Sequence, residues 1–174
     1  MQRASKHAPA GHWPAAEAVA EIALDFDERH RRRIRLVAST GEDVLLDLPA
    51  AVAMADGDGI ETEDGRWLRI RAKPEPLVAV TAPDRHGLMR LAWHLGNRHT
   101  PAELQADRIL IRPDHVLADM ARGLGGAAVD VIEPFQPEGG AYGGHGHAHA
   151  HDDDHGHDHD HGHGHHHHHH HDHD

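Results

Sequence analysis

The end of the sequence holds the residues whose types and spacing point most directly to chemistry. Residues 143–174 consist almost entirely of His, Asp and Gly, so most of their side chains offer an imidazole nitrogen or a carboxylate to a divalent metal ion. This segment contains 17 of the 24 histidines of the chain, which are His145, His147, His149, His151, His155, His157, His159, His161, His163, His165, His166, His167, His168, His169, His170, His171 and His173. It has no apolar residue larger than alanine and cannot build a hydrophobic core. We therefore predict a disordered metal-binding tail over residues 143–174.

The composition of this tail has two alternative interpretations. The seven consecutive histidines 165–171 would by themselves fit a purification tag, but the alternating His-Gly, His-Ala and His-Asp sequence before them is not typical of one. The second interpretation is a solvated acidic tail without a role. The high proportion of histidine in this segment argues against it. If about three to four imidazoles hold each ion, the tail has room for roughly four to six metal ions.

Composition narrows the class of protein. The chain of 174 residues has no cysteine, which excludes disulfides and thiolate metal sites, and leaves imidazole and oxygen as metal ligands. Its formal net charge is −12, and acidic residues also outnumber basic residues outside the tail, so nucleic acid is not an expected partner.

We expect the locally basic cluster Arg29, Arg31, Arg32, Arg33 and Arg35 to be mostly solvated on a strand. Without an apolar signal segment or an apolar run of about 20 residues, we expect a soluble cytoplasmic protein that does not enter a membrane.

The remaining residues must supply the elements that position any metal site. Residues 1–16 look poorly ordered. Between residues 17 and 74, apolar and polar side chains alternate over 18–26, 33–38, 44–48 and 67–71, with Asp-Gly turns between them, which predicts a small N-terminal β domain. The Pro74-Glu75-Pro76 segment marks the boundary.

Residues 75–142 show a different order of elements. A β-branched strand over 77–81 is followed by a helix that Asp84 can cap and Gly96 ends. Short strands follow over 104–106 and 108–111. Asp114 can then cap a second helix, and the last strand covers 128–132. The order β-α-β-β-α-β predicts a ferredoxin-like domain. The expected fold class is α+β, with a small N-terminal β domain, a ferredoxin-like domain and a disordered His-rich tail.

Seven histidines lie outside the tail. We expect His7, His12 and His30 to be solvated, and His86 and His94 to share the outer face of the first helix. His99 follows the helix end, where a side chain can project from a rigid support, and His115 lies beside Asp114 at the start of the second helix. The sequence contains no nucleophile motif, phosphate-binding loop or His-Glu-x-x-His motif, so it offers no case for an enzyme.

Three separated motifs carry a family resemblance. They are HLGNRHxP over residues 94–101, DHVLxDM over 114–120, and PFxPExGAY over 134–142, followed by the His-rich tail. In this order they resemble the UreE-type urease accessory proteins, which are nickel metallochaperones. The resemblance implies an N-terminal β domain for partner binding, a ferredoxin-like metal-binding domain and a homodimer. The principal nickel ligand of the family falls on His99, and a further ligand of some members on His115. Other members have a histidine where this chain has Pro113.

The resemblance also implies cargo and partners. We expect a chaperone that binds Ni²⁺ and donates it to apo-urease through the accessory GTPase complex during nickel insertion, with Zn²⁺ or Cu²⁺ also able to bind in vitro. A His99 pair across a dimer axis, completed by tail imidazoles, would form the core site. One alternative is a storage or detoxification protein for Ni, Zn or Cu without a client. Another is an enzyme with a metal-binding tail, such as a prolyl isomerase, although no aromatic-lined site is evident.

Overall fold

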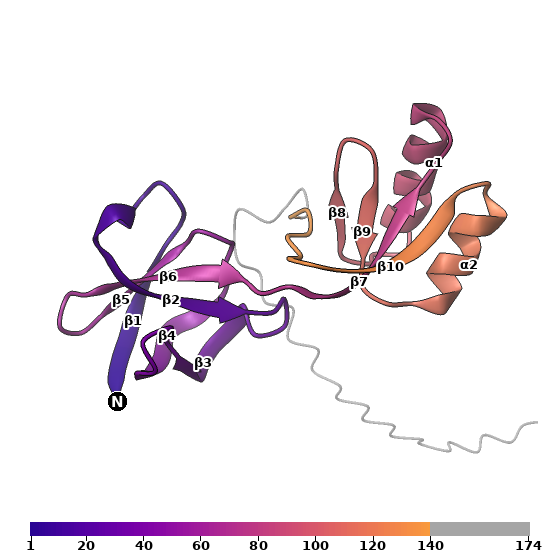
Figure 1. Cartoon of the computed structure of the whole chain (residues 1–174). Coiled ribbons are helices and arrows are strands. Elements are labelled where there is room, and N and C mark those ends of the chain that lie inside the picture. Colours follow the sequence, from indigo (N-terminus) through magenta and orange to yellow (C-terminus); the bar gives the residue numbers. More distant parts are fainter. Residues whose placement is uncertain (140–174) are drawn as a thin grey trace, which may run out of the picture. The chain divides into compact units, whose positions relative to one another are not determined.

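The structure is a computed structural model that describes residues 1–139 (Figure 1). The predicted tail and its 17 histidines lie outside the described residues. Two sheets make up the described part, and contacts place both in a single unit, Met1–Gly140. No helix within residues 1–139 is long and apolar enough to cross a membrane.

The N-terminal sheet contains six strands. They are β1 (Gln2–Ala8), β2 (Ala18–Leu24), β3 (His30–Val37), β4 (Asp43–Ala53), β5 (Gly59–Thr62) and β6 (Trp67–Ala72), with a short 3-10 helix at Ala15–Glu17. Their order in the sheet is β2-β6-β5-β1-β4-β3. Alternate side chains such as Ile22, Leu46, Ile60 and Ile70 point into one core and are fully buried, which is the outcome expected of period-two apolar patterning.

The start of the chain corrects the prediction of a poorly ordered segment over residues 1–16. Strand β1 lies inside the sheet, parallel to β4 and antiparallel to β5. Trp13, which follows it, is buried and stacks on Trp67 with ring centroids 5.4 Å apart. Gly59 makes room for the Trp13 ring, because a Cβ at residue 59 would lie 2.4 Å from a ring carbon. Packing of this indole therefore orders a segment whose strand residues are mostly small or polar.

His7 is also placed differently from the prediction of a solvated side chain. It is partly buried, and its Nε2 lies 2.7 Å from Oδ2 of the buried Asp58. The same carboxylate accepts hydrogen bonds from the backbone N–H groups of Ala10 and Ala55. Asp58 therefore holds together the end of β1, the loop after it and the turn before β5.

The second sheet confirms the predicted α+β class and the β-α-β-β-α-β order. Its elements are β7 (Glu75–Thr81), α1 (Arg85–Gly96), β8 (Ala102–Leu104), β9 (Ile109–Ile111), α2 (His115–Gly123) and β10 (Ala127–Glu133). The strand order is β10-β7-β9-β8, and β9 is antiparallel to both neighbours. Strands β7 and β8 are thus parallel with β9 between them, which is the split βαβ arrangement.

Both helices pack on the same face of this sheet (Figure 1). Leu91 and Leu95 of α1 and Ala121 of α2 are buried against Val78 and Val80 of β7. Each helix begins where predicted, because the side chains of Asp84 and Asp114 accept hydrogen bonds from backbone N–H groups in the first turn.

The other face of the sheet packs on two phenylalanines that lie far apart in the chain. Leu77, Ala79 and Leu110 bury against Phe135, which is fully buried after β10. The Phe26 ring from the N-terminal part meets the Phe135 ring edge-on at 5.4 Å. The two sheets therefore share an apolar contact beside the segment that leads to the tail.

Candidate metal centre

His99 lies in the loop between α1 and β8, three residues after the helix ends. Leu95 anchors the last turn of α1 in the core. The N–H of Arg98 donates to the Leu95 carbonyl oxygen, and the N–H of His99 donates to the Gly96 carbonyl oxygen, both at 3.0 Å. These bonds use carbonyl groups that a helix end leaves without intrahelical partners. The His99 backbone is thus fixed to the helix while its side chain is exposed.

The His99 backbone adopts a left-handed conformation, with φ of 53°. Within residues 1–139 it is the only residue other than glycine with a positive φ. This conformation costs an L-residue about 1 kcal/mol relative to glycine, which is the usual residue at such a position after a helix. Strained backbone of this kind concentrates at functional sites. An imidazole in place of the expected glycine is therefore the first structural feature that singles out His99.

The segment after β10, residues 134–139, lies beside the His99 loop and is called the C-terminal segment below. The N–H of Glu138 donates to the Ala102 carbonyl oxygen at 2.8 Å, and the N–H of Gln136 donates to the Glu103 carboxylate at 2.7 Å. These bonds hold the segment along β8, next to the loop that carries His99.

His99 lines a cavity of about 420 Å³, called the His99 cavity below. Its walls are Phe26, Arg29, His30, Ala53, Met54, His99, Thr100, Pro101, Gln136, Pro137, Glu138 and Gly139. The cavity thus combines residues of the N-terminal sheet, the His99 loop and the C-terminal segment. It presents two imidazoles and one carboxylate against a partly apolar wall.

Arg29 is a residue whose role the sequence did not reveal. The prediction of solvated arginines holds for Arg31 and its neighbours on β3, but Arg29 is only 3% exposed. Its guanidinium donates to the carbonyl oxygens of Met54 and Phe135 and to Oε1 of Gln136. Burial lowers the pKa of Arg29, while the surrounding carboxylates, Glu75 foremost, raise it. Arg29 therefore clasps the C-terminal segment at the edge of the His99 cavity.

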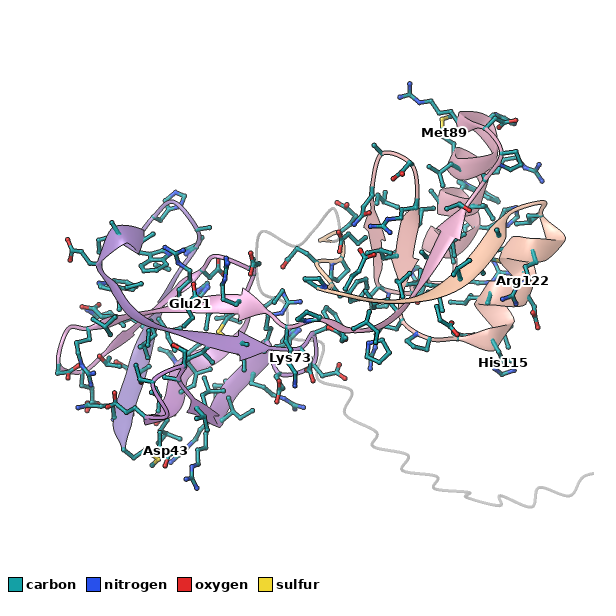
Figure 2. All side chains as sticks on the ribbon, viewed as in Figure 1. Glu21, Asp43, Lys73, Met89, His115 and Arg122 are labelled. Atoms are coloured by element: carbon teal, nitrogen blue, oxygen red, sulfur yellow. The ribbon has the colours of Figure 1, made fainter. Side chains whose placement is uncertain are left out.

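His115 is the first residue of α2 and is exposed (Figure 2). The Asp114 carboxylate beside it is occupied as a helix cap, accepting from the N–H groups of Val116 and Leu117 at 2.8 and 3.0 Å. His115 is not among the residues that line the His99 cavity. Its role as a ligand stays a prediction.

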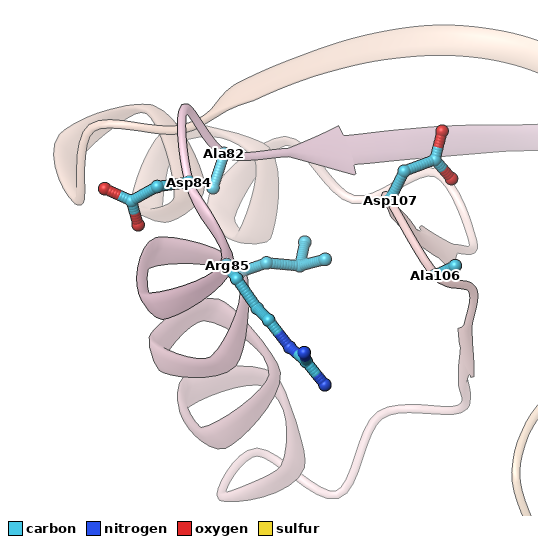
Figure 3. Close-up of a pocket in the computed structure, with 6 residues that line it drawn as sticks. Ala82, Asp84, Arg85, Ala106 and Asp107 are labelled. Carbon is cyan, nitrogen blue, oxygen red and sulfur yellow. The ribbon is translucent and has the colours of Figure 1, made fainter.

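A second cavity, between α1 and the turn after β8, contains no histidine (Figure 3). It is lined by Ala82, Asp84, Arg85, Leu88, Ala106 and Asp107. Asp84 is the cap of α1, and Figure 3 shows Arg85 extending between the helix and the turn that carries Asp107. A cationic side chain in this position opposes metal binding.

Across residues 1–139, no three His, Asp or Glu side chains are close enough to form a complete metal site. A single imidazole binds metal weakly, so a tight site on His99 needs further ligands, and the described residues do not supply a complete set. The exposed imidazole is compatible with Ni²⁺, Cu²⁺ or Zn²⁺, all of which accept nitrogen ligands of this type.

Comparison with known proteins identifies the family. Residues 2–73 match the family model described as the UreE urease accessory protein N-terminal domain, and residues 75–174 match the corresponding C-terminal domain. The chain belongs to the UreE urease accessory protein family. The two matches meet at residue 74, within the Pro74-Glu75-Pro76 segment.

Individual relatives support the same family. The chain is 51% identical over 144 residues to a urease accessory protein UreE of Rhodopseudomonas palustris, covering 82% of this chain and 66% of the relative. It is 49% identical over 143 residues to a UreE of Rhodobacter capsulatus, covering 82% of this chain and 88% of the relative. A UreE of a Chelativorans species is 52% identical over 124 residues, covering 71% of this chain and 78% of the relative. The resemblance drawn from the three sequence motifs is thereby confirmed.

Proposed function

We propose that this chain is a nickel carrier that collects Ni²⁺ on its histidine-rich tail and passes it through a site built on His99 into urease. Membership of the UreE family supports a role in urease assembly. The observation that carries the assignment of the site is His99 itself, an exposed imidazole on a strained backbone beside a cavity. The proposed role is that of a chaperone and not of an enzyme.

The site is proposed to be shared by two subunits. A two-fold axis near His99 would bring a second copy of the imidazole without new sequence, and tail imidazoles would complete the coordination. The apo-urease and the urease accessory GTPase complex are the proposed recipients. Because Cu²⁺ binds more tightly than Ni²⁺ to nitrogen ligands, metal selectivity must come from supply and from the partner rather than from the site alone.

The central test compares how much His99 and the tail each contribute to urease activation. We expect deletion of residues 144–174 to lower bound nickel severalfold and to leave about one ion per dimer. We expect His99→Ala in the full chain to impair urease activation more than the tail deletion does. The matched control is His86→Ala, because His86 is exposed at the start of α1 and does not line the His99 cavity. Equal urease activation by the wild type and His99→Ala would reject this function of His99.

A storage protein without a client is the second candidate, and the abundance of tail histidine favours it as well. A deletion strain separates the two. Loss of urease activity that excess nickel restores supports the carrier, whereas metal sensitivity with normal urease activity supports storage.

A further inference from the structure

We propose that His30 is a second imidazole ligand of the metal that His99 binds. One chain would then hold the ion with two histidines that lie far apart in the sequence. This inference rests on the proposed function. The N-terminal sheet would then contribute a metal ligand, because His30 belongs to that sheet and lines the His99 cavity.

The first support is the placement of His30. It is the first residue of β3, it is exposed, and it pairs with Ala53 of β4, which also lines the cavity. No side-chain hydrogen bond occupies either His30 or His99 within residues 1–139. Both rings can therefore turn toward an ion without losing a described partner.

The second support is the residue beside it. Arg29 is buried and donates to the Phe135 carbonyl oxygen and to Gln136 in the C-terminal segment. The backbone N–H of Asp56 donates to the same Gln136 oxygen at 3.1 Å, which strengthens the attachment. Because Arg29 and His30 are consecutive, this clasp fixes the His30 backbone next to the segment that borders His99. The imidazole pair is thus a product of tertiary structure, not of sequence spacing.

The chemistry of the cavity suits a transient metal ion. Two neutral imidazoles are good ligands for Ni²⁺, and the Glu138 carboxylate on the same wall adds negative charge. Phe26 and Met54 make part of the wall apolar, which lowers the local dielectric and strengthens charge interactions. Two imidazole ligands leave coordination positions open, so the ion can be exchanged rapidly, as delivery requires.

The test uses a full-length background in which the 17 tail histidines are replaced by asparagine, so that the tail does not absorb the metal. Zn²⁺, a diamagnetic probe, is titrated while the ¹⁵N chemical shifts of the imidazole nitrogens are followed. We expect the ring nitrogens of His30 and His99 to shift together at the first equivalent. A ligand shifts in this way, whereas a residue that is merely nearby does not.

Equilibrium dialysis with Ni²⁺ provides the second measurement. His30→Ala should weaken binding by at least about tenfold, an effect of the size seen even for groups that only support a ligand. His86→Ala is the matched control and should leave binding unchanged. Thermal unfolding of His30→Ala should match that of the parent, since the side chain is exposed.

The outcomes separate this inference from the proposed function. If His99 shifts with Zn²⁺ while His30 does not, and His30→Ala binds Ni²⁺ normally, the inference is overturned and the carrier function stands. If neither nitrogen shifts and His99→Ala also binds normally, the proposed site fails with it.

Discussion

The guanidinium of Arg29 donates a hydrogen bond to the carbonyl oxygen of Phe135, a residue 106 positions later in the chain. Arg29 precedes β3 of the N-terminal sheet, and Phe135 follows the last strand of the second sheet. The bond is buried and lies beside the edge-on contact of Phe26 with Phe135. One polar contact and one apolar contact thus fix the C-terminal segment to the N-terminal part of the chain.

Replacement of Arg29 should be strongly destabilising. We expect Arg29→Ala to lower the free energy of unfolding by about 2 to 4 kcal/mol, because the buried carbonyl groups of Met54 and Phe135 lose a charged donor. Urea denaturation measures the change. Arg31→Ala is the control, since Arg31 is exposed on β3 and its loss should change stability by less than about 0.5 kcal/mol. Equal stabilities of the two variants would contradict this role of Arg29.

The left-handed backbone at His99 predicts that this position favours metal binding at the expense of folding stability. We expect His99→Gly to be more stable than His99→Ala by about 1 kcal/mol, because glycine adopts a φ of 53° without strain. Both variants should lose nickel binding at the proposed site equally. His115→Gly is the control: His115 lies in a helix, so glycine there should be less stable than alanine. The same order of stabilities at both positions would refute the argument.

Asp58 should be the most sensitive carboxylate of the N-terminal sheet. Asp58→Ala leaves the N–H groups of Ala10 and Ala55 and the His7 ring without their acceptor, so we expect a loss of about 2 to 3 kcal/mol in denaturant unfolding. Glu63→Ala removes only an exposed ion pair with Arg3 and should cost less than about 1 kcal/mol. A loss at residue 63 as large as that at residue 58 would count against the buried network.

Acid should destabilise the N-terminal sheet, because it protonates Glu42 and Asp64 in a small surface cluster around Arg66. Hydrogen bonds from Arg66 lower the pKa of Glu42, and hydrogen bonds from Thr62 and Arg66 lower the pKa of Asp64. A lowered folded-state pKa stabilises the protein above the unfolded-state pKa of about 4, and this contribution is lost as pH falls further. Stability measured by urea between pH 5 and pH 3 should therefore decrease, and less steeply in Arg66→Gln. Identical slopes of stability against pH for the parent and Arg66→Gln would show that this cluster contributes nothing to the acid sensitivity.

Under the proposed function, metal binding by the tail should also weaken as pH falls, but at a higher pH than the loss of stability. Imidazole must be deprotonated to bind metal, and its ordinary pKa is about 6.5, so bound Ni²⁺ should decrease as pH falls through about 6. Equilibrium dialysis of the full chain at pH 7.5, 6.5 and 5.5 measures this loss. Nickel occupancy that stays constant down to pH 5.5 would show that histidine is not the main ligand.

The sequence predicted elements whose signals are local. Leu88, Leu91 and Leu95 define a helix by spacing, and Asp84 and Asp114 are recognisable caps, so α1 and α2 begin where expected. Strand β1 was missed because Ala4 is its one buried apolar residue and its partners β4 and β5 lie far along the chain.

The candidate site could be predicted only in part, for the same reason. The His99 motif is visible in sequence, but its left-handed backbone is a property of the loop after α1. Arg29 lies in a run of solvated arginines, and its acceptors are backbone carbonyls that no side-chain pattern marks. The meeting of His30 with His99 in one cavity likewise depends on contacts between distant segments.

Gly139, the last described residue, lines the His99 cavity, and His145 follows six positions later. A chain of that length spans at most about 20 Å, so the first tail imidazoles are tethered near His99 at an effective concentration on the order of millimolar. Under the proposed function, exchange of an ion between tail and cavity is then a first-order process. Its rate would not change on dilution, and a scarce carrier would load its site as quickly as an abundant one.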